Sequence, residues 1–325
     1  MADQNRIECV QYESRHEAEW DEFLDGSGQH SVLQSRAFLG YHGNRFEDRS
    51  IVIIDRLSKR IVGVMPAAIH PQEPEIVVSH PGSTFGGLLL GGVDPTYFGT
   101  TFELVLRHFR EIGFKTLRYK TTPSFVFRQP DETESYHGLA HGRLVRCDLW
   151  SVLRLSGGYR FHQKRRASIA AAKRNGLVVR ATSDEADWQA FYDVLQANLR
   201  DRHDTSPVHT AEELLDLKRR LGTKSQLLIA TTANGEIASG VWMIDYQHGV
   251  SHTQYIASTA EGRKTNAVDL VLGEAIESAA ARGYSHFSFG VSSERDGSLN
   301  DSLLKFKLRF DAGVVNYMIF DFALR

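Results

Sequence analysis

A lysine stands inside an apolar run near the end of the sequence, in the segment Leu303–Phe310. The apolar positions of this segment suit a helix and a strand equally well, so periodicity does not decide its conformation. An ammonium group is expensive to bury without a partner. Lys307 therefore either reaches water along its aliphatic stem or faces a functional site.

A second group of chemically capable residues precedes a predicted helix over residues 267–282. The segment Arg263–Asn266 reads Arg-Lys-Thr-Asn. Free N–H groups at a helix N-terminus, flanked by basic side chains, can hold a phosphate. The same residues also suit a solvated loop with an asparagine cap. The sequence contains neither a Walker loop nor the dinucleotide-binding fingerprint.

A basic helix is predicted within residues 159–175, where Gly176 ends it. Its cations are Lys164, Arg165, Arg166, Lys173 and Arg174. A charge run usually forms a solvated face. The alternative is a surface that binds a phosphorylated or otherwise anionic ligand.

A glycine-rich segment, Ser83–Gly87, has the sequence STFGG. Its glycines allow a ligand to approach the backbone closely, and Ser83 and Thr84 offer hydroxyl groups. The alternative is a glycine-rich turn that leads into a buried strand.

These segments lie in two halves that resemble each other. AEWDEFLD (Ala18–Asp25) recurs as ADWQAFYD (Ala186–Asp193). A hairpin sequence and a helix-glycine-strand sequence recur in the same order at a spacing of about 170 residues, which is the length of a domain. This order favours an ancestral duplication. Two copies of one fold create a cleft between them, and we expect the segments that differ between the copies to carry the function.

Each half reads as a helix, an antiparallel hairpin, a further strand, a second helix and a final strand. Gly113 and Gly283 follow the second helices, where a left-handed cap favours glycine. This order predicts an α+β fold with a mixed sheet. We expect the boundary near Asp148, with domains over residues 1–148 and 149–325.

The composition excludes several classes of protein. A length of 325 residues accommodates two domains, and a formal charge of −2 argues against a dedicated nucleic-acid binder. Cys9 and Cys147 are too few for a structural zinc site or a disulfide framework, so no metal site is expected. The N-terminal residues are polar, and the longest apolar stretch is half of the ~18 residues that span a bilayer. We therefore expect a cytoplasmic protein without a membrane span.

Three groups of residues resemble the FemAB branch of the GNAT-like acyltransferases. They are the end of the basic helix (AAAKRNG), the stretch Tyr255–Lys264 (Y-x-A-S-x-x-E-G-R-K) and the terminal pattern G-x-S…L-L-x-F-K-x-x-F over Gly290–Phe310. This family has two tandem GNAT-type domains and transfers an acyl or aminoacyl group to an amine. The resemblance implies an α+β fold of two GNAT-like domains, each with a mixed, mainly antiparallel sheet flanked by helices.

The sequence departs from the family at two places. Between Leu199 and Gln226 there is room for one short helix and not for the helical arm that peptidoglycan-bridge enzymes typically insert, which disfavours a tRNA donor. The family's pyrophosphate loop, R-x-x-G-x-G/A, keeps its arginine and alanine in Arg263–Ala267 but lacks the central glycine.

The resemblance also implies the site residues. Phe306 and Lys307 match the Phe-Lys pair near the acyl-transfer centre, and Ser83–Gly87 match the segment that lines the acceptor groove. Amine attack on an acyl donor needs a proton acceptor and stabilisation of the oxyanion. We predict that Lys307 stabilises the oxyanion or fixes the donor, and that His252, Glu294, or Ser292 with a relayed water accepts the proton. The predicted donor-binding residues are Tyr255, Arg263, Lys264, Asn266 and Phe306, and the predicted acceptor-binding residues are Gln34, Ser83, Thr84, Phe85, Gly86, Gly87, Lys164 and Arg165.

The predicted function is N-acylation of a cell-envelope precursor such as a nucleotide-linked amino sugar. The donor is expected to be an acyl-CoA-type co-substrate, and no permanently bound cofactor is expected. One alternative is aminoacyl transfer from a charged tRNA. Another is a non-catalytic glycan- or peptide-binding protein on the same fold. A hydrolase is the least favoured, because Ser292 and Ser293 lack a nucleophile-elbow pattern.

Overall fold

The structure is a computed structural model that describes residues 6–27, 31–91, 95–129, 131–203, 205–247 and 249–325. The chain divides into two compact units, which we call the first and second unit. The first comprises Met1–Asp148 with Asn316–Arg325, and the second comprises Leu149–Val315. The predicted second domain extended to residue 325, whereas the structure groups the residues from Asn316 onward with the first unit. The reason is that the last strand pairs with a strand of that unit at Ile319–Ala323.

The first unit contains two groups of paired strands and four α-helices among its described residues. Strands β1 (Ile7–Gln11), β2 (Ile51–Asp55), β3 (Ile61–Met65) and β6 (Leu89–Leu90) pair antiparallel in that order. Strands β4 (Ala68–Ile69), β5 (Ile76–Val78), β7 (Thr116–Lys120) and β14 (Gly313–Ala323) form the second group. The α-helices are α1 (Glu17–Ser27), α2 (Arg36–Leu39), α3 (Pro95–Glu111) and α4 (Thr133–His141), and the 3-10 helices are η1 (Ser14–His16), η2 (Val32–Gln34), η3 (Gly40–His42) and η4 (Ser124–Val126).

The second unit is built on strands in the order β8-β13-β12-β11-β10-β9. These are β8 (Arg143–Arg154), which begins in the first unit, β9 (Val178–Thr182), β10 (Ser225–Thr231), β11 (Ile237–Tyr246), β12 (Val250–Ser258) and β13 (His286–Val291). The helices are α5 (Gln163–Arg174), α6 (Glu185–His203), α7 (Ala211–Leu221), α8 (Ala260–Lys264), α9 (Ala267–Ala281), α10 (Asp301–Leu308) and the 3-10 helix η5 (Gly222–Lys224). Among these strands only β12 and β13 pair in parallel. The predicted α+β fold with mixed, mainly antiparallel sheets is confirmed.

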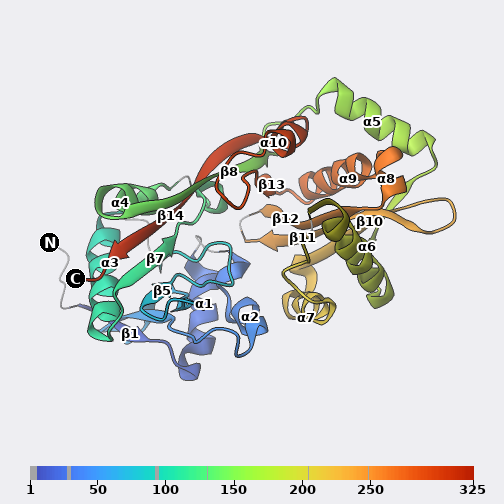
Figure 1. Cartoon of the computed structure of the whole chain (residues 1–325). Helices are drawn as coiled ribbons and strands as arrows, with labels where there is room; N and C mark the ends of the chain where they lie inside the picture. Colours follow the sequence, from blue (N-terminus) through green and yellow to red (C-terminus); the bar gives the residue numbers. More distant parts are fainter. Residues whose placement is uncertain (1–5, 28–30, 92–94, 130, 204, 248) are drawn as a thin grey trace. The chain divides into compact units, whose positions relative to one another are not determined.

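Helices cover both faces of this sheet because its side chains alternate between two apolar layers. Met243 of β11 belongs to the core under α9, whereas its neighbour Trp242 lies 6.0 Å, between ring centroids, from Trp188 of α6. Figure 1 shows α9 between α5 and the strands β10 to β12. Since α9 is enclosed by the sheet and by α5, it is apolar along most of its length.

The repeated sequence corresponds to repeated structure. The recurring Trp20 and Trp188 are both buried, in α1 and α6. The recurring hairpins form β2–β3 and β10–β11. Each unit also contains a short parallel pair, β5 with β7 and β12 with β13. The duplicated sequence pattern thus encodes a helix with a buried tryptophan, a hairpin and a parallel strand pair in each unit, although the hairpin and the parallel pair lie in separate sheets in the first unit and in one sheet in the second.

Local signals account for most helix boundaries. The short helix expected between Leu199 and Gln226 begins at Ala211, because Thr210 caps it by accepting a hydrogen bond from the Glu213 backbone. The basic helix begins at Gln163, after His162. Residues 301–308 form α10, so the ambiguous segment around Lys307 is helical.

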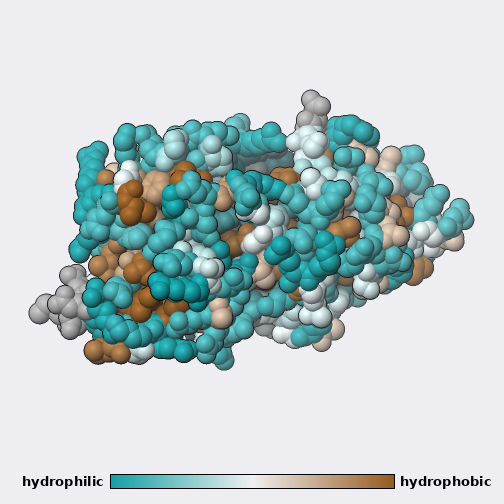
Figure 2. Space-filling view, turned by 90° about the horizontal axis from the view of Figure 1, so that it is seen from below, coloured by the Kyte–Doolittle hydropathy of each residue, from teal (hydrophilic) through white to brown (hydrophobic). Residues whose placement is uncertain are grey.

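The face of the molecule drawn in Figure 2 is mostly hydrophilic, with hydrophobic residues in small groups. In the described part of the chain, no helix combines the length and apolarity that crossing a bilayer requires. Within the same residues, no three or more His, Cys, Asp or Glu side chains are grouped so that they could hold a metal ion.

Candidate functional site

The strands β12 and β13 separate after three paired residues. They pair only where Val250–His252 face His286–Ser288, although β12 continues to Ser258 and β13 to Val291. Past this point β12 pairs on its other edge with β11, and β13 with β8. The facing edges therefore carry backbone groups without a strand partner, and an extended ligand can pair with such an edge.

The side chain of Lys307 reaches this separation from α10. Its Nζ donates to the carbonyl oxygens of Gly290 (2.9 Å) and Val291 (2.6 Å), and the residue is 3% exposed. An ammonium group carries three donors, and the described residues supply acceptors for two of them. Burial lowers the pKa of Lys307 from 10.5 to about 7, because no carboxylate among the described residues pairs with it. Lys307 can therefore exchange a proton near neutral pH.

Gly290 arranges the two carbonyl groups that hold Lys307. Successive carbonyls of a regular strand point in opposite directions. Here the register against β8 shifts between Ser288 and Gly290, and Gly290 has a φ of +74°. This bulge breaks the alternation, so that two consecutive carbonyls serve one ammonium group. A Cβ at Gly290 would lie 3.5 Å from Cε1 of His252, so Gly290 lies between His252 and Lys307.

His252 is buried at the last paired position of β12. Its Nδ1 lies 2.9 Å from the hydroxyl of Ser288, which accepts a hydrogen bond from Trp150 Nε1 at 2.7 Å. The ring stacks on Tyr246 at 5.3 Å between centroids. Burial, and then the charge of Lys307, lower the pKa of His252 to about 3. His252 is therefore neutral at physiological pH and a weaker proton acceptor than Lys307.

The other two candidate proton acceptors are engaged by other side chains. Glu294 is exposed and accepts a hydrogen bond from Asn300 Nδ2 at 2.5 Å. Ser292 is buried, and its hydroxyl lies 3.1 Å from that of Ser151. The structure thus brings Lys307 and His252 to the same glycine, whereas Glu294 lies in the turn that follows β13.

The predicted donor-binding residues lie at three places in the second unit. Tyr255 of β12 is half-buried, and its hydroxyl lies 2.8 Å from His209 Nδ1 and accepts from the Val208 backbone at 3.2 Å. Phe306 precedes Lys307 on α10 and is half-buried. The remaining three residues, Arg263, Lys264 and Asn266, lie at the junction of α8 and α9.

At that junction, Arg263 and Lys264 are exposed and Asn266 adopts the left-handed conformation, with a φ of +61°. Arg263 Nη1 donates to the Ser258 carbonyl at 2.8 Å, and Lys264 pairs with Glu261 at 3.3 Å. Lys264 can leave its exposed partner Glu261 at small cost, whereas the partner of Arg263 is the carbonyl of the buried Ser258. The junction therefore keeps the composition of an anion-binding helix start.

Arg165 is part of the fold of the second unit. It is 4% exposed, forms an ion pair with Asp269 of α9, and donates from Nη2 to the Phe306 carbonyl at 3.1 Å. Its guanidinium also lies 4.2 Å from the ring centroid of Phe310. Burial lowers the pKa of Arg165 to about 10. Arg165 thus joins α5 to α9 and α10, whereas the neighbouring Lys164 is exposed.

The glycines of the STFGG segment lie against protein atoms. A Cβ at Gly86 would lie 2.8 Å from the Ser79 carbonyl oxygen, and one at Gly87 would lie 2.3 Å from the Glu134 carboxylate. Phe85 and Ser83 are buried, and the Ser83 hydroxyl donates to the Phe85 carbonyl at 2.8 Å. Thr84 is the one member of the segment whose side chain is exposed.

A half-buried lysine fixes the turn that precedes this segment. Lys120 Nζ donates to the carbonyl oxygens of His80 (3.2 Å), Pro81 (3.3 Å) and Ser83 (2.7 Å). Burial, and then Arg118, lower the pKa of Lys120 to about 8. The turn closes the end of the parallel pair β5–β7, the counterpart of the pair that separates at Lys307.

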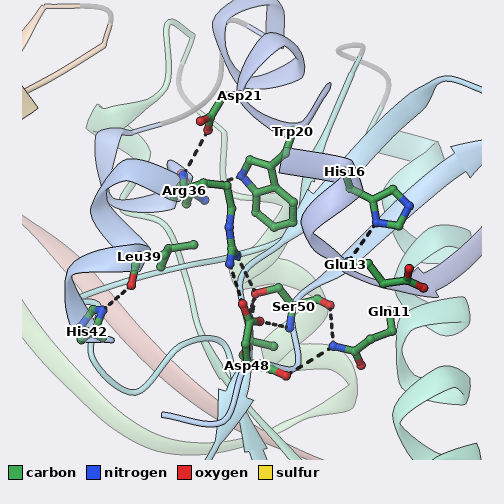
Figure 3. A network of polar contacts seen from close by, with 12 residues as sticks. Gln11, Glu13, His16, Trp20, Asp21, Arg36, Leu39, His42, Asp48 and Ser50 are labelled. Carbon is green, nitrogen blue, oxygen red and sulfur yellow. Dashed lines mark hydrogen bonds and ion pairs between the residues drawn. The ribbon is translucent and has the colours of Figure 1, made fainter. Parts of the chain in front are cut away.

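The remaining predicted acceptor residue, Gln34, is fully buried and bonded within the first unit. Its side-chain Oε1 accepts a hydrogen bond from the Ser31 backbone N–H at 3.0 Å, and its backbone carbonyl oxygen accepts one from Trp20 Nε1 at 2.9 Å. Figure 3 shows the adjacent network, in which Arg36 points from α2 toward Asp48 and Ser50. Arg36 Nη2 donates to Asp48 at 2.6 Å. These contacts join the repeated tryptophan helix to the β2 strand.

Sequence reasoning missed three residues of the site: Trp150, Ser288 and Gly290. Trp150 and Ser288 are 138 positions apart and meet only because β8 and β13 are neighbours. No local pattern marks such a pair. Gly290 carried a signal, since it begins the terminal pattern that resembles the FemAB branch and a glycine within a strand often marks a bulge.

Comparisons with known proteins agree with this architecture. Residues 159–297 match the family model of the acetyltransferase (GNAT) domain, a range that contains His252 and ends before Lys307. No curated protein sequence matches the chain. Three solved structures share the fold across nearly the whole length, with sequence identities of 12% or less.

The first of these is FemX, with a TM-score of 0.70 at 10% identity over 97% of each chain. L-PGS from Bacillus licheniformis has a TM-score of 0.63 at 12% identity, over 97% of this chain and 93% of that one. A tandem GNAT protein from the clavulanic acid biosynthesis pathway has a TM-score of 0.55 at 11% identity, over 98% of this chain and 99% of that one. The predicted fold of two tandem GNAT-like domains is confirmed.

Proposed function

We propose that this chain, whose second unit carries a GNAT acetyltransferase domain and which as a whole has the tandem-GNAT fold of FemX, is an N-acyltransferase. The observation that carries the proposal is the burial of Lys307 at the point where β12 and β13 separate. An ammonium group held there by two carbonyls, without a carboxylate partner among the described residues, is costly for the fold. We explain the presence of this destabilising group by a role in proton transfer.

In the proposed reaction, neutral Lys307 accepts a proton from the acceptor amine as its nitrogen attacks the carbonyl carbon of the acyl donor. The C–N bond forms and the carbonyl oxygen becomes an oxyanion. The tetrahedral intermediate then expels the leaving thiolate as the C–S bond breaks, and Lys307 returns a proton to the sulfur. A pKa near 7 suits both steps, because the charged and the neutral form of Lys307 are then both populated near neutral pH.

We assign the donor to the second unit and favour an acyl-CoA-type thioester. The GNAT match supports this donor. The exposed Arg263 and Lys264, beside the start of α9, are the proposed partners of its phosphates. Tyr255 and Phe306 are the proposed contacts of its acyl arm. We disfavour a tRNA donor, because α7 is the one α-helix that the structure describes between His203 and β10, whereas the family's arm is a helical hairpin.

We propose an amino group on a cell-envelope precursor, such as a nucleotide-linked amino sugar, as the acceptor. Thr84 and Lys164 are the predicted acceptor residues whose side chains are exposed. The other predicted acceptor residues are buried, so in this proposal they hold the backbone near the acceptor and do not contact it. These are Gln34, Ser83, Phe85, Gly86, Gly87 and Arg165.

The test is release of free thiol from acetyl-CoA and longer acyl-CoAs in the presence of a panel of amino sugars and their nucleotide-linked forms. Transfer by the wild-type protein, and its loss in a folded Lys307→Met variant, would support the assignment. Unchanged kcat in Lys307→Met would remove Lys307 from the reaction. Binding of a panel member without transfer from any donor would favour a glycan- or peptide-binding protein.

Aminoacyl transfer from a charged tRNA is the second candidate, favoured by the similarity of the fold to FemX and L-PGS. The resemblance to the FemAB branch implies such a donor in peptidoglycan-bridge enzymes. A tRNA donor would make binding fall steeply with salt, because each phosphate contact releases counterions. A salt titration of binding, run in parallel for tRNA and acyl-CoA, separates the two donors.

A further inference from the structure

Three buried side chains from three strands form a chain of hydrogen bonds that ends on His252. Trp150 of β8 donates from Nε1 to the Ser288 hydroxyl of β13 at 2.7 Å. The same hydroxyl lies 2.9 Å from Nδ1 of His252 on β12. Trp150, Ser288 and His252 are 1%, 0% and 6% exposed, so water does not compete for these bonds.

The direction of each bond follows from the donors and acceptors available. An indole N–H can only donate, so the Ser288 oxygen accepts from Trp150. The Ser288 hydroxyl still has one hydrogen to donate. Among the described residues its one acceptor is Nδ1 of His252. If Nδ1 carried a hydrogen instead, the fully buried Ser288 hydroxyl would lack an acceptor, which is costly.

His252 therefore accepts at Nδ1 and carries its proton on Nε2. The described residues provide no hydrogen-bond partner for Nε2. The stacking on Tyr246 fixes the plane of the ring. The Cε1 atom, which is bonded to Nε2, faces Gly290, whose carbonyl oxygen accepts from Lys307. The Nε2–H group is thus a fixed, neutral donor bonded to the ring carbon that faces Gly290, the glycine that also binds Lys307.

We propose that Trp150 and Ser288 are positioning residues that hold His252 as the Nε2–H tautomer, so that His252 donates a hydrogen bond to the carbonyl oxygen of the acyl donor as negative charge develops on it. This rests on the proposed acyl transfer. It replaces the role of proton acceptor that the sequence suggested for His252. A preorganised donor of this kind contributes about 100-fold to kcat, as single oxyanion-hole donors do.

The first measurement is independent of activity. Long-range 1H–15N correlation spectra of protein labelled at histidine report which ring nitrogen carries the proton. We expect the Nε2–H form of His252 in the wild type, and a mixture of tautomers in Ser288→Ala. The matched control is Ser151→Ala, which removes a buried serine hydroxyl on β8 that bonds to Ser292. An Nδ1–H tautomer in the wild-type protein would overturn the proposal.

The second measurement compares two substitutions at His252. A glutamine amide can place its N–H near the position of Nε2, whereas an asparagine amide reproduces only Nδ1. We expect His252→Gln to retain at least ten times the kcat of His252→Asn. Ser288→Ala, which leaves a mixture of tautomers, should lower kcat in proportion to its Nδ1–H fraction, with little change in KM. Equal loss in both His252 variants, in folded protein, contradicts a donor role.

The two proposals fail in distinguishable ways. If the wild-type protein transfers no acyl group from any donor in the panel, the acyl-transfer function is refuted, and with it the role of His252 in stabilising an oxyanion. If transfer occurs but His252 is the Nδ1–H tautomer, the acyl-transfer function is supported and the positioning role of Trp150 and Ser288 is refuted. Trp150→Phe provides the cross-check, because it removes the donor while it keeps an aromatic ring in the core.

Discussion

Lys307 donates a hydrogen bond to the carbonyl oxygen of Gly290, and the same glycine lies against His252. One backbone position thus connects the proposed proton acceptor with the proposed oxyanion donor. Gly290 can occupy it because it lacks a Cβ and adopts a positive φ of +74°. The two side chains therefore depend on each other through the bulge of β13, and a change at one of the three residues is expected to affect the others.

The pH dependence of transfer tests the role of Lys307. Burial lowers its pKa to about 7, and the neutral amine is the form that accepts a proton. We expect kcat/KM to rise with pH to a plateau, with a midpoint near 7. Lys307→Arg should lose activity at every pH, because a guanidinium does not deprotonate in this range. A profile that stays flat between pH 6 and pH 9 would contradict the assignment.

The same pKa shift predicts how stability depends on pH. The unfolded Lys307 binds a proton below 10.5 and the folded one only below about 7, so burial costs nothing above 10.5 and costs most below 7. The full shift corresponds to a few kcal/mol. We expect Lys307→Met to gain stability relative to the wild type as pH falls from 10 to 7. Urea unfolding at several pH values measures the difference, and Lys305→Met, an exposed neighbour on α10, is the control.

The sequence predicted the fold better than the site. The repeated helix and hairpin sequences and the glycines after the helices are signals in the sequence, and they identified most elements of both units. Lys307 was identified as a candidate site residue because a charged side chain within an apolar run is costly to bury. Arg165 could not be separated from Lys164, since both lie in one run of charge and only the packing of α9 and α10 buries one of them. Glu134 gave no signal, because an acid near a helix start is ordinary.

Glu134 is expected to make the first unit sensitive to pH. Its carboxyl group is buried beside Tyr119 and accepts from the Thr122 backbone at 2.7 Å, and burial raises its pKa from 4.5 to about 8. The folded state therefore holds a proton that the unfolded state loses, and stability falls as pH rises from 4.5 to 8. Glu134→Gln keeps the shape without the charge.

We expect Glu134→Gln to abolish this decline and to be more stable than the wild type at pH 8. Chemical unfolding followed between pH 5 and pH 8 measures it. Glu132→Gln, at an exposed position two residues earlier, should leave the decline unchanged. A wild-type protein whose unfolding free energy stays constant over this range would contradict the neutral form of Glu134.

Gly87 tests whether the STFGG segment serves packing or ligand approach. An added Cβ would lie 2.3 Å from the Glu134 carboxylate, so Gly87→Ala should lower stability by about 1–3 kcal/mol. Shortening the partner in Glu134→Ala removes the clash, and the double variant should recover part of the loss. Thr84→Val changes an exposed side chain and should leave stability unchanged. If Gly87→Ala instead raises KM for the acceptor at unchanged stability, the segment binds ligand through Gly87.

Arg165 was predicted to bind the acceptor, and the structure gives it an alternative role with a separate readout. Its ion pair with Asp269 is buried, so removing one partner leaves an uncompensated charge. We expect Asp269→Asn to lower the free energy of unfolding by about 3–5 kcal/mol. Lys164→Gln, at the exposed neighbouring position, should change it by less than about 0.5 kcal/mol.

Urea unfolding and acceptor KM, measured on Arg165→Lys, separate the role in packing from the role in acceptor binding. A lower midpoint with unchanged KM indicates a role in packing, since an ammonium group does not reproduce the planar guanidinium fork that binds both Asp269 and the Phe306 carbonyl. A raised KM at an unchanged midpoint would restore the predicted contact with the acceptor.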